Sequence, residues 1–500
     1  MNKVITLLGL VMLMAACQSK KLQNIEITFQ IDMSEIIEDI EDPSTIGIVG
    51  SGPLNWEITP LEDKGNGIYA ITFDWPIKDT TDIEYTFIHS YDTFDEGNIG
   101  EAAYRKIKPT PGKQILPQVK WGDLPPLAIG RANPAPMLKV ERADTDAERK
   151  ALKIPFLGVT SEGLIESNLF SIKKTNISTS KIKTAVEEFL SSLSPSQRNN
   201  CTFSINDEEW RRWSNIDYYE RKGVGLIDLN KTQKALVFQI LKESLSPKGY
   251  NKTQDIMKME QYLARLTGES ELLGPDLYWF SFMGTPSETD PWGWQIDGHH
   301  LVINYFILGD QIVMTPTFMG SEPNYIADGE NAGTRTFEHE ERLGLKFYKS
   351  LNEQQKTAAT LFDKKDYNYL QTGAYSDNAI VPYKGLKLSL LDKSQRVILE
   401  ELIFEYIGNA KEGHAEIRMK EILEHMEETY FSWIGGSNGK EPFYYRVHSP
   451  VVMIEFDHQK PIFLEGNAPS KKHVHTIVRT PNGNDYGKDL LKQHLESHHH

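Results

Sequence analysis

A proline-rich segment divides this 500-residue chain and most constrains how it can fold. Seven prolines fall between residues 109 and 136. Because proline lacks a backbone N–H and its ring fixes φ, neither a helix interior nor a central strand can run through such a segment. A chain of this length also exceeds what one hydrophobic core usually holds. We therefore predict two folded domains, at 25–120 and 137–500, joined by a linker at 121–136.

The N-terminus has the features of a lipoprotein export signal. Lys3 precedes an uncharged apolar stretch at residues 4–15, which is too short to span a membrane as a helix but suits a signal peptide. Met14-Ala-Ala-Cys17 then resembles a lipobox, with Met where Leu is usual. We predict a signal peptide at 1–16, lipidation of Cys17, a tether at 17–24 and an extracytoplasmic protein anchored to a bacterial membrane, on its periplasmic or cell-surface side. The alternative is an ordinary signal peptide with an incidental cysteine.

Charge and cysteine content exclude some classes of partner and bond. The net charge is -16, and no basic patch of the kind that binds nucleic acid is visible in the sequence. The chain has two cysteines, so once Cys17 is lipidated, Cys201 has no intramolecular disulfide partner. Oligomeric state is left open by the sequence.

The first domain is predicted to be a small all-β, immunoglobulin-like sandwich. Residues 25–31 alternate apolar and polar side chains, and further short alternating runs follow between turn signals. The segments around Phe29, 49–56, 61–69 and 85–87 resemble the starch-binding type of carbohydrate-binding module. That resemblance implies that Trp56 and Trp75 stack on sugar rings. The alternative is a plain spacer in which both tryptophans are core or edge residues.

The second domain is predicted to be α+β, with helices flanking a mostly antiparallel sheet. Four segments place Ser, Asn or Asp three residues before Gln, which is the capping-box signal of a helix start: Ser194, Asn230, Asn352 and Asp392. These signals do not recur at a regular short period, so no solenoid is predicted. Residues 301–318 are expected to form a β-hairpin, 395–434 to be helical, and 450–456 and 474–479 to be strands.

Histidines of the second domain suggest a metal site. His299 and His300 open the strand at 301, and the period-two rule places them on opposite faces of it. His473 and His475 share one face of the last strand with Arg479. We predict that His300, His473 and His475 bind a divalent metal, zinc or iron, with an open position. A metal-free acid–base pocket and a set of purely structural histidines are the alternatives.

Further residues receive provisional roles from their positions near these strands. Asp457 or His458 is expected to act as a base, and Arg479 to position an anionic group of the substrate. The dense turn after the last strand, with Asn482, Asn484 and Asp485, is read either as a binding loop or as a plain turn. The histidines His299 and His448 complete the set of candidate binding residues.

The second domain also resembles a known bacterial family. The resemblance rests on Trp292-Gly-Trp-Gln-Ile-Asp-Gly-His-His300, on Pro481-Asn-Gly-Asn-Asp-Tyr-Gly487 and on the segments 315–320, 442–450 and 454–459. This family is the domain of unknown function 3500, and the resemblance covers roughly 135–500. It implies no activity. From the predicted histidine site and Arg479, we hypothesise a metal-assisted hydrolase acting on a small anionic or carbohydrate-derived substrate. The alternatives are a non-catalytic, surface glycan-binding lipoprotein and oxygen or redox chemistry at a histidine-bound iron.

Overall fold

The computed structural model of the chain describes residues 23–37, 40, 43–54, 58–77, 82–89, 99–101, 105–110, 112–121, 126–128, 146–217 and 219–498. Residues 1–139 and 140–500 form two compact units. The predicted signal peptide, residues 17–22 of the predicted tether with Cys17, and Trp56 lie outside the described residues, whereas residues 23 and 24 of that tether belong to the first strand. No helix in the described part of the chain is both long and apolar enough to cross a membrane.

The first unit consists of two small sheets. One has the order β10-β1-β5-β4, with β9 beside β1: β1 (Gln23–Asp32), β4 (Glu62–Gly65), β5 (Ile68–Ile77), β9 (Gly112–Ile115) and β10 (Val119–Lys120). The other has the order β11-β7-β6-β2-β3, with β8 beside β6: β2 (Gly47–Gly50), β3 (Thr59–Pro60), β6 (Ile83–His89), β7 (Ile99–Glu101), β8 (Arg105–Ile107) and β11 (Pro126–Ala128). Two 3-10 turns, η2 (Pro43–Thr45) and η3 (Gly52–Leu54), flank β2.

Alternating side chains of β1 form the core of this unit. Ile25, Ile27, Phe29 and Ile31 are fully buried, and they pack with β6 residues such as Phe87. Because successive strand residues face opposite sides of a sheet, this alternation buries one face of β1 against the second sheet. The predicted small all-β sandwich is confirmed.

Two details of this unit bear on the predicted linker and sugar site. Pro126–Ala128, inside the predicted linker, pair with β7 as strand β11. Trp75 lies in β5 opposite Ile25, but its side chain is outside the described part of the chain. Sugar binding therefore stays a prediction.

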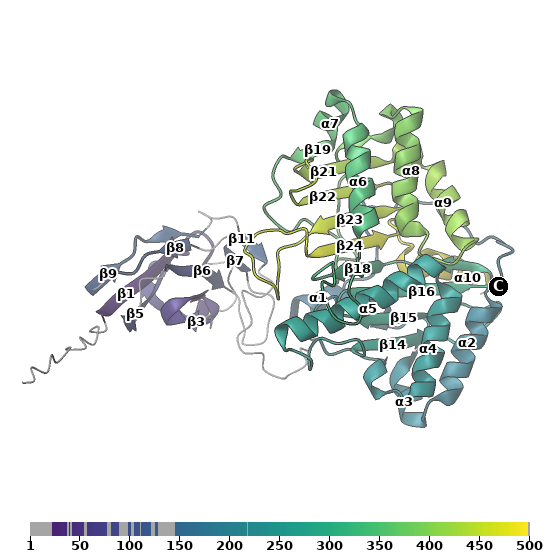
Figure 1. The fold of residues 1–500 in the computed structure, drawn as a ribbon, viewed down its shortest axis with the longest axis horizontal. Helices are drawn as coiled ribbons and strands as arrows, with labels where there is room; N and C mark the ends of the chain where they lie inside the picture. Colours follow the sequence, from purple (N-terminus) through teal and green to yellow (C-terminus); the bar gives the residue numbers. More distant parts are fainter. Residues whose placement is uncertain are drawn as a thin grey trace, which may run out of the picture. The chain divides into compact units, whose positions relative to one another are not determined.

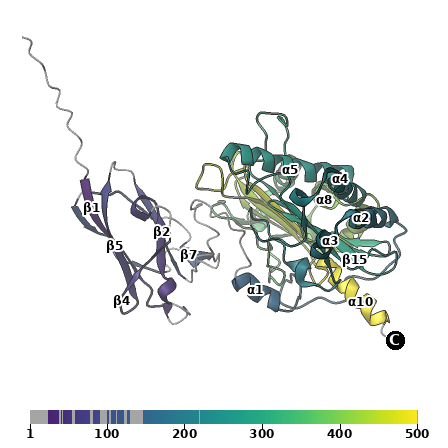
Figure 2. The same cartoon turned by 90° about the horizontal axis from the view of Figure 1, so that it is seen from below.

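The second unit is built on a 13-stranded sheet with most of its helices packed on one face, whereas α1 (Asp146–Lys153) and α10 (Lys488–His498) lie on the other (Figures 1 and 2). Its main order is β12-β14-β15-β16-β18-β24-β23-β22-β21-β19, with β13, β17 and β20 paired at β14, β16 and β21. The strands are β12 (Thr202–Phe203), β13 (Val224–Gly225), β14 (Tyr278–Met283), β15 (Trp292–Gly298), β16 (Leu301–Leu308), β17 (Gln311–Val313), β18 (Thr317–Ser321), β19 (Thr360–Phe362), β20 (Leu386–Lys387), β21 (Tyr430–Gly435), β22 (Phe443–His448), β23 (Met453–His458) and β24 (Val474–Arg479).

Groups of helices alternate with groups of strands along the chain. They are α1 (Asp146–Lys153), α2 (Ser180–Ser192), α3 (Pro195–Cys201), α4 (Lys231–Ser244), α5 (Pro247–Thr267), α6 (Glu338–Ser350), α7 (Glu353–Ala359), α8 (Lys393–Ile407), α9 (His414–Glu424) and α10 (Lys488–His498). Short 3-10 turns are η4 (Glu208–Arg211), η5 (Leu226–Asp228), η6 (Leu388–Leu390), η7 (Met426–Glu428) and η8 (Asp485–Gly487). The predicted α+β class, with a mostly antiparallel sheet, is confirmed.

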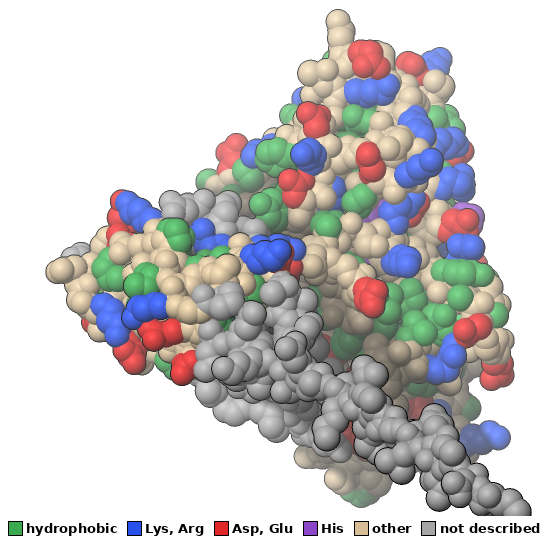
Figure 3. Space-filling view, turned by 60° about the vertical axis from the view of Figure 1, so that its left-hand side comes forward, with side chains coloured by type: hydrophobic (Ala, Val, Ile, Leu, Met, Phe, Trp, Pro, Cys, Tyr) green, Lys and Arg blue, Asp and Glu red, His purple; other side chains and the backbone are tan. Residues whose placement is uncertain are grey.

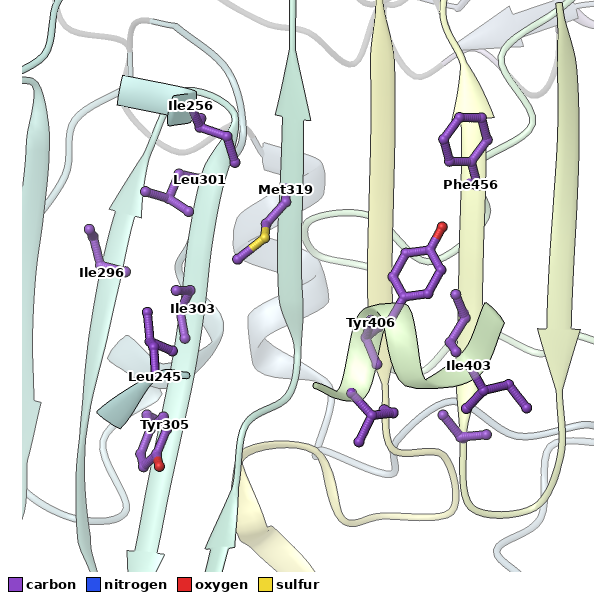
Figure 4. Close-up of a cluster of buried hydrophobic side chains, with 14 of the residues drawn as sticks. Leu245, Ile256, Ile296, Leu301, Ile303, Tyr305, Met319, Ile403, Tyr406 and Phe456 are labelled. Atoms are coloured by element: carbon purple, nitrogen blue, oxygen red, sulfur yellow. The ribbon is translucent and has the colours of Figure 1, made fainter. Parts of the chain in front are cut away.

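The sheet separates two layers of buried side chains. Residues such as Ile303, Met319 and Phe456 face the helices and pack with Leu245 of the α4–α5 junction and Ile403 of α8 (Figure 4). The other face is covered by long connecting segments, and Trp210, Trp213 and Tyr486 lie among its buried apolar groups. On the side shown in Figure 3, acidic and basic side chains are interspersed over the surface.

One order of elements occurs twice in this unit. A helix, a short helix, two short strands, two helices and a run of antiparallel strands appear from α2 to β18 and again from α6 to β24. The short strands pair alike, β12 and β19 in parallel with β14 and β21, and β13 and β20 antiparallel to them. The halves meet where β18 pairs antiparallel with β24. The fold therefore has an approximate twofold repetition about the β18–β24 boundary.

The four predicted capping boxes belong to this repetition, and all four are formed. In the first half, Gln233 donates to the carbonyl oxygen of Ser192, and in the second half Gln395 donates to that of Ser350. Each of these glutamines thereby ties the second capped helix of its half, α4 or α8, to the last residue of the first helix of that half, α2 or α6. The start signals thus recur because a long unit is repeated, which no short period could reveal.

The prediction of helix throughout 395–434 is partly wrong. α8 and α9 occupy most of it, but Tyr430–Gly435 form β21, which pairs with β22 along its whole length. Aromatic side chains favour this strand because Phe431 and Trp433 pack on the helix-covered face of the sheet. The hairpin expected within 301–318 is confirmed as β16 and β17, which join at Gly309 and Asp310.

Candidate metal centre

A two-residue turn presents the first pair of histidines. Gly298 pairs with Leu301 in the β15–β16 hairpin, so His299 and His300 are its two loop residues. His300 has φ of 60°, a left-handed conformation that is uncommon outside glycine. The two imidazoles stack with ring centres 3.8 Å apart. The prediction that they lie on opposite strand faces is wrong, because turn geometry replaces the alternation of a strand.

Glu260 on α5 holds both rings. Its two carboxylate oxygens each lie 2.8 Å from an Nδ1 atom, one of His299 and one of His300. Burial opposes ionisation of this carboxyl, but the charge and hydrogen bonds of the two histidines outweigh it and lower the pKa of Glu260 to about 2. Burial likewise opposes charge on His299, yet the neighbouring carboxylate raises the pKa of that imidazole. Glu260 is therefore an anion that fixes both ring orientations.

The start of β24 supplies the other two imidazoles. His473 Nε2 lies 2.9 Å from His475 Nε2 and 3.3 Å from His300 Nε2. Gly320 of β18 is the register partner of His475, and a Cβ there would lie 2.9 Å from ring carbons of both His300 and His475. Only a residue without a side chain leaves room for both rings to meet.

Hydrogen bonds to the Nδ1 atoms of His300 and His473 determine whether their converging Nε2 atoms carry a proton. His300 Nδ1 faces the Glu260 carboxylate, and His473 Nδ1 lies 2.7 Å from the carbonyl oxygen of Lys460. Both partners only accept hydrogen bonds, so each Nδ1 carries the proton. Burial lowers the pKa of His300 to about 3 and also lowers that of His473, which keeps both rings neutral. Their Nε2 lone pairs then point at each other.

A cation bound between the two nitrogens would remove this repulsion. Two nitrogen ligands about 2.05 Å from a tetrahedral metal lie roughly 3.3 Å apart, close to the separations seen here. The three ligand atoms of His300, His473 and His475 lie within 4.8 Å of one another, as do those of Glu260, His299 and His300. Each group can therefore hold a metal ion. The first has only imidazole nitrogens and suits zinc or iron, whereas Glu260 is better placed to orient His300, as carboxylates do behind metal-binding histidines.

Of the three predicted catalytic residues, only Asp457 lies next to this cluster. It is the register partner of His475 in β23, and its carboxylate accepts from the backbone N–H groups of Tyr369 and Leu370 and pairs with Lys365 at 2.9 Å. Burial raises the pKa of Asp457 to about 6, against the opposing charge of Lys365. The carboxylate is thus used to hold a connecting segment beside His475, and a role as free base does not fit.

His458 and Arg479 do not join the cluster. His458 packs on the helix-covered face, with Nδ1 accepting from Phe443 N and Nε2 3.2 Å from Glu341. Arg479 lies four residues beyond His475, roughly 13 Å along the strand, and is fully buried. Each of its nitrogens donates internally, to Asp377, Asp485 and the carbonyl oxygens of Thr372 and Gly373. This guanidinium neutralises buried carboxylates, and a role in positioning substrate stays a prediction.

Three of the remaining predicted binding residues form hydrogen bonds within the protein, and a fourth, His448, is buried away from the cluster. Asn482 accepts from Glu166 N and donates to the carbonyl oxygen of Pro450, and Asn484 accepts from Leu490 N. Asp485 accepts from Thr480 N. His448 is buried in β22, and neither of its ring nitrogens has a hydrogen-bond partner among the described residues. The turn after β24 is therefore a structural cap that holds several segments together.

Sequence reasoning missed Glu260, Glu322 and Gly320. Glu322 is buried, accepts from the N–H groups of Ile462 and Leu464, and lies 3.5 Å from His473 Nδ1. A glutamate on the buried stripe of an amphipathic helix was the one signal that could have pointed to Glu260, because such charges need a partner.

Comparison with known proteins places the large unit in a family. The model of a protein family of unknown function, DUF3500, matches residues 175–488, which is more than half of the chain. The chain belongs to the DUF3500 family. The match contains all four clustered histidines and Glu260. A search of curated proteins finds no match to the chain.

Proposed function

We propose that this DUF3500 protein is an extracytoplasmic metalloenzyme, a metal-assisted hydrolase that holds zinc or iron on His300, His473 and His475. The observation that carries the proposal is the convergence of three imidazole Nε2 atoms, two of which have their protons fixed on Nδ1 by acceptors. Three protein ligands leave a position for water, whose pKa a metal lowers to about 7. His475 is only partly buried, so this position can face solvent.

The surroundings of His473 support a small anionic substrate. Lys471 and Lys472, which precede it in sequence, line a surface cleft of about 270 Å³ together with Arg335, Glu338 and Glu341, although none of the three ligand histidines lines that cleft. Lys471 pairs with Glu341. Arg335 stacks on Tyr325, with its guanidinium carbon 4.0 Å from the ring centre. Arg335 and Lys472 have no ion-pair partner in the part of the chain that the structure describes, so they can attract a carboxylate or phosphate.

Metal content tests the proposal. The chain from residue 18 would be purified without a tag and with 498–500 removed, and analysed by elemental mass spectrometry. We expect near-stoichiometric zinc or iron in this protein and none in His473→Ala/His475→Ala. The matched control His339→Ala/His425→Ala removes two imidazoles outside the cluster and should keep the metal. No metal in the folded parent would overturn the site, and metal without hydrolysis of phosphate or carboxylate esters would overturn the reaction.

We also propose that Cys17 anchors the protein to its membrane. The support is the apolar stretch at 4–15 followed by Ala15-Ala16-Cys17. The full chain expressed in a bacterium should incorporate labelled palmitate and fractionate with membranes, and Cys17→Ser should abolish the label. Unchanged labelling of Cys17→Ser would refute the anchor.

A further inference from the structure

A second site of a different kind lies on the helix-covered face of the large unit. A cavity of about 180 Å³ is enclosed by strands β17, β18 and β24 and by helices α5, α8 and α9. It sits where the two halves of the repetition meet, and the histidine cluster does not line it. Its apolar wall includes Ile312, Met314, Met319, Ile407, Val478 and Leu490.

Two buried polar side chains line this cavity without partners. Asn409 follows α8 and is 5% exposed, and its Oδ1 accepts no hydrogen bond from any described residue. His414 begins α9 and is 4% exposed, and its Nε2 is likewise unpartnered among the described residues. Buried polar atoms are nearly always hydrogen-bonded, and leaving one unpaired is costly. Two such atoms on one cavity wall indicate that a molecule inside the cavity, either ordered water or a ligand, supplies the missing bonds.

The buried charges around the cavity are already paired, and Glu424, which also lines it and has no ion pair among the described residues, is exposed to solvent. Lys252 pairs with Glu340 at the inner wall, and near the mouth Arg418 lies 3.1 Å from Glu421. Burial lowers the pKa of His414 to about 4, so this imidazole is neutral at pH 7. A charged ligand inside the cavity would therefore lose its hydration without finding a buried, unpaired opposite charge. The wall favours an uncharged molecule.

We infer that this cavity binds a small, uncharged, largely apolar molecule that carries a hydroxyl group. The volume sets the size, because an apolar cavity of about 150 Å³ accommodates benzene, so one ring or a short aliphatic chain fits here. The hydrogen-bonding group follows from Asn409, whose free oxygen requires a donor. This site does not depend on the proposed metal centre.

Phenol and benzene serve as probes, because they differ only in the hydroxyl group. Binding to the chain from residue 18 would be measured by calorimetry and ligand-observed NMR. We expect saturable binding of one phenol per chain, about tenfold tighter than benzene. Asn409→Leu should weaken phenol about tenfold and leave benzene unchanged. The metal-site variant His473→Ala/His475→Ala should bind phenol like the parent.

Filling the cavity gives the complementary test. Val478→Phe and, separately, Ile312→Phe place a ring inside it and should each abolish binding, whereas Val397→Phe adds the same bulk on the exposed face of α8. Circular dichroism identifies the variants that remain folded. The inference is overturned if the folded parent binds no phenol, if binding survives in a folded filled variant, or if Asn409→Leu affects phenol and benzene alike.

Discussion

Replacing Gly320 with alanine tests the histidine cluster most directly. A Cβ at this position would lie 2.9 Å from the Cδ2 atoms of His300 and His475 and 2.8 Å from the carbonyl oxygen of Val474. Carbon atoms make favourable contacts at about 3.5–4.0 Å, so the two rings must move apart by about 0.6 Å or more. Metal–ligand distances tolerate only about 0.2 Å.

Two quantities should therefore change in Gly320→Ala. Metal affinity, measured by competition with a chromogenic chelator, should fall by about 10–100-fold. Losses of this size are typical when a group that orients a metal ligand is removed. The free energy of unfolding of the metal-free protein should fall by about 1–3 kcal/mol, the usual effect of overpacking. Gly274→Ala is the matched control, because its Cβ would meet no neighbour closer than 3.8 Å.

A double-mutant cycle assigns the effect to the rings. In a His300→Ala/His475→Ala background, only the contact with the Val474 carbonyl oxygen remains, so Gly320→Ala should destabilise the protein less than in the parent. Parental metal affinity in Gly320→Ala would show that the imidazoles do not meet at this glycine, and the argument for the metal centre would fail with it.

Three further changes have expected outcomes. Glu260→Gln should lower metal affinity about 10–100-fold, measured by the same chelator competition, because an amide cannot accept from both imidazoles as a carboxylate does. Burial lowers the pKa of His448 to about 3, so unfolding takes up a proton below pH 6.5. His448 should therefore contribute about 2 kcal/mol to the fall in the free energy of unfolding from pH 7 to pH 5, and in urea titrations that fall should be smaller by this amount in His448→Phe. Asp377→Asn should lower the free energy of unfolding by about 3–5 kcal/mol in the same urea titrations, because it breaks ion pairs with Arg211 and Arg479 that are each 2.8 Å long. The metal content should not change. An unchanged unfolding midpoint would contradict this expectation.

Local patterns in the sequence were enough to predict most of the element types and the class of fold. The alternation from Ile25 to Ile31 produces a strand with one buried face, and the pairs Asn230–Gln233 and Asp392–Gln395 begin helices as predicted. Each depends on side chains a few residues apart, whose geometry the backbone alone determines. For the same reason the His-x-His spacing of His473 and His475 correctly selected two of the converging imidazoles.

Only the tertiary structure decided which side chains share a site. Glu260 reaches His300 from a helix that lies far away in sequence, and Gly320 leaves room because β18 lies beside β24. Arg479 was expected to face substrate, since it shares a strand face with His475, but the segment that covers this face brings Asp377 against it. Strand periodicity specifies the face on which a residue lies and carries no information about what packs on that face. That outcome depends on contacts between distant segments, and these contacts determine whether a buried charge is a structural partner or a ligand.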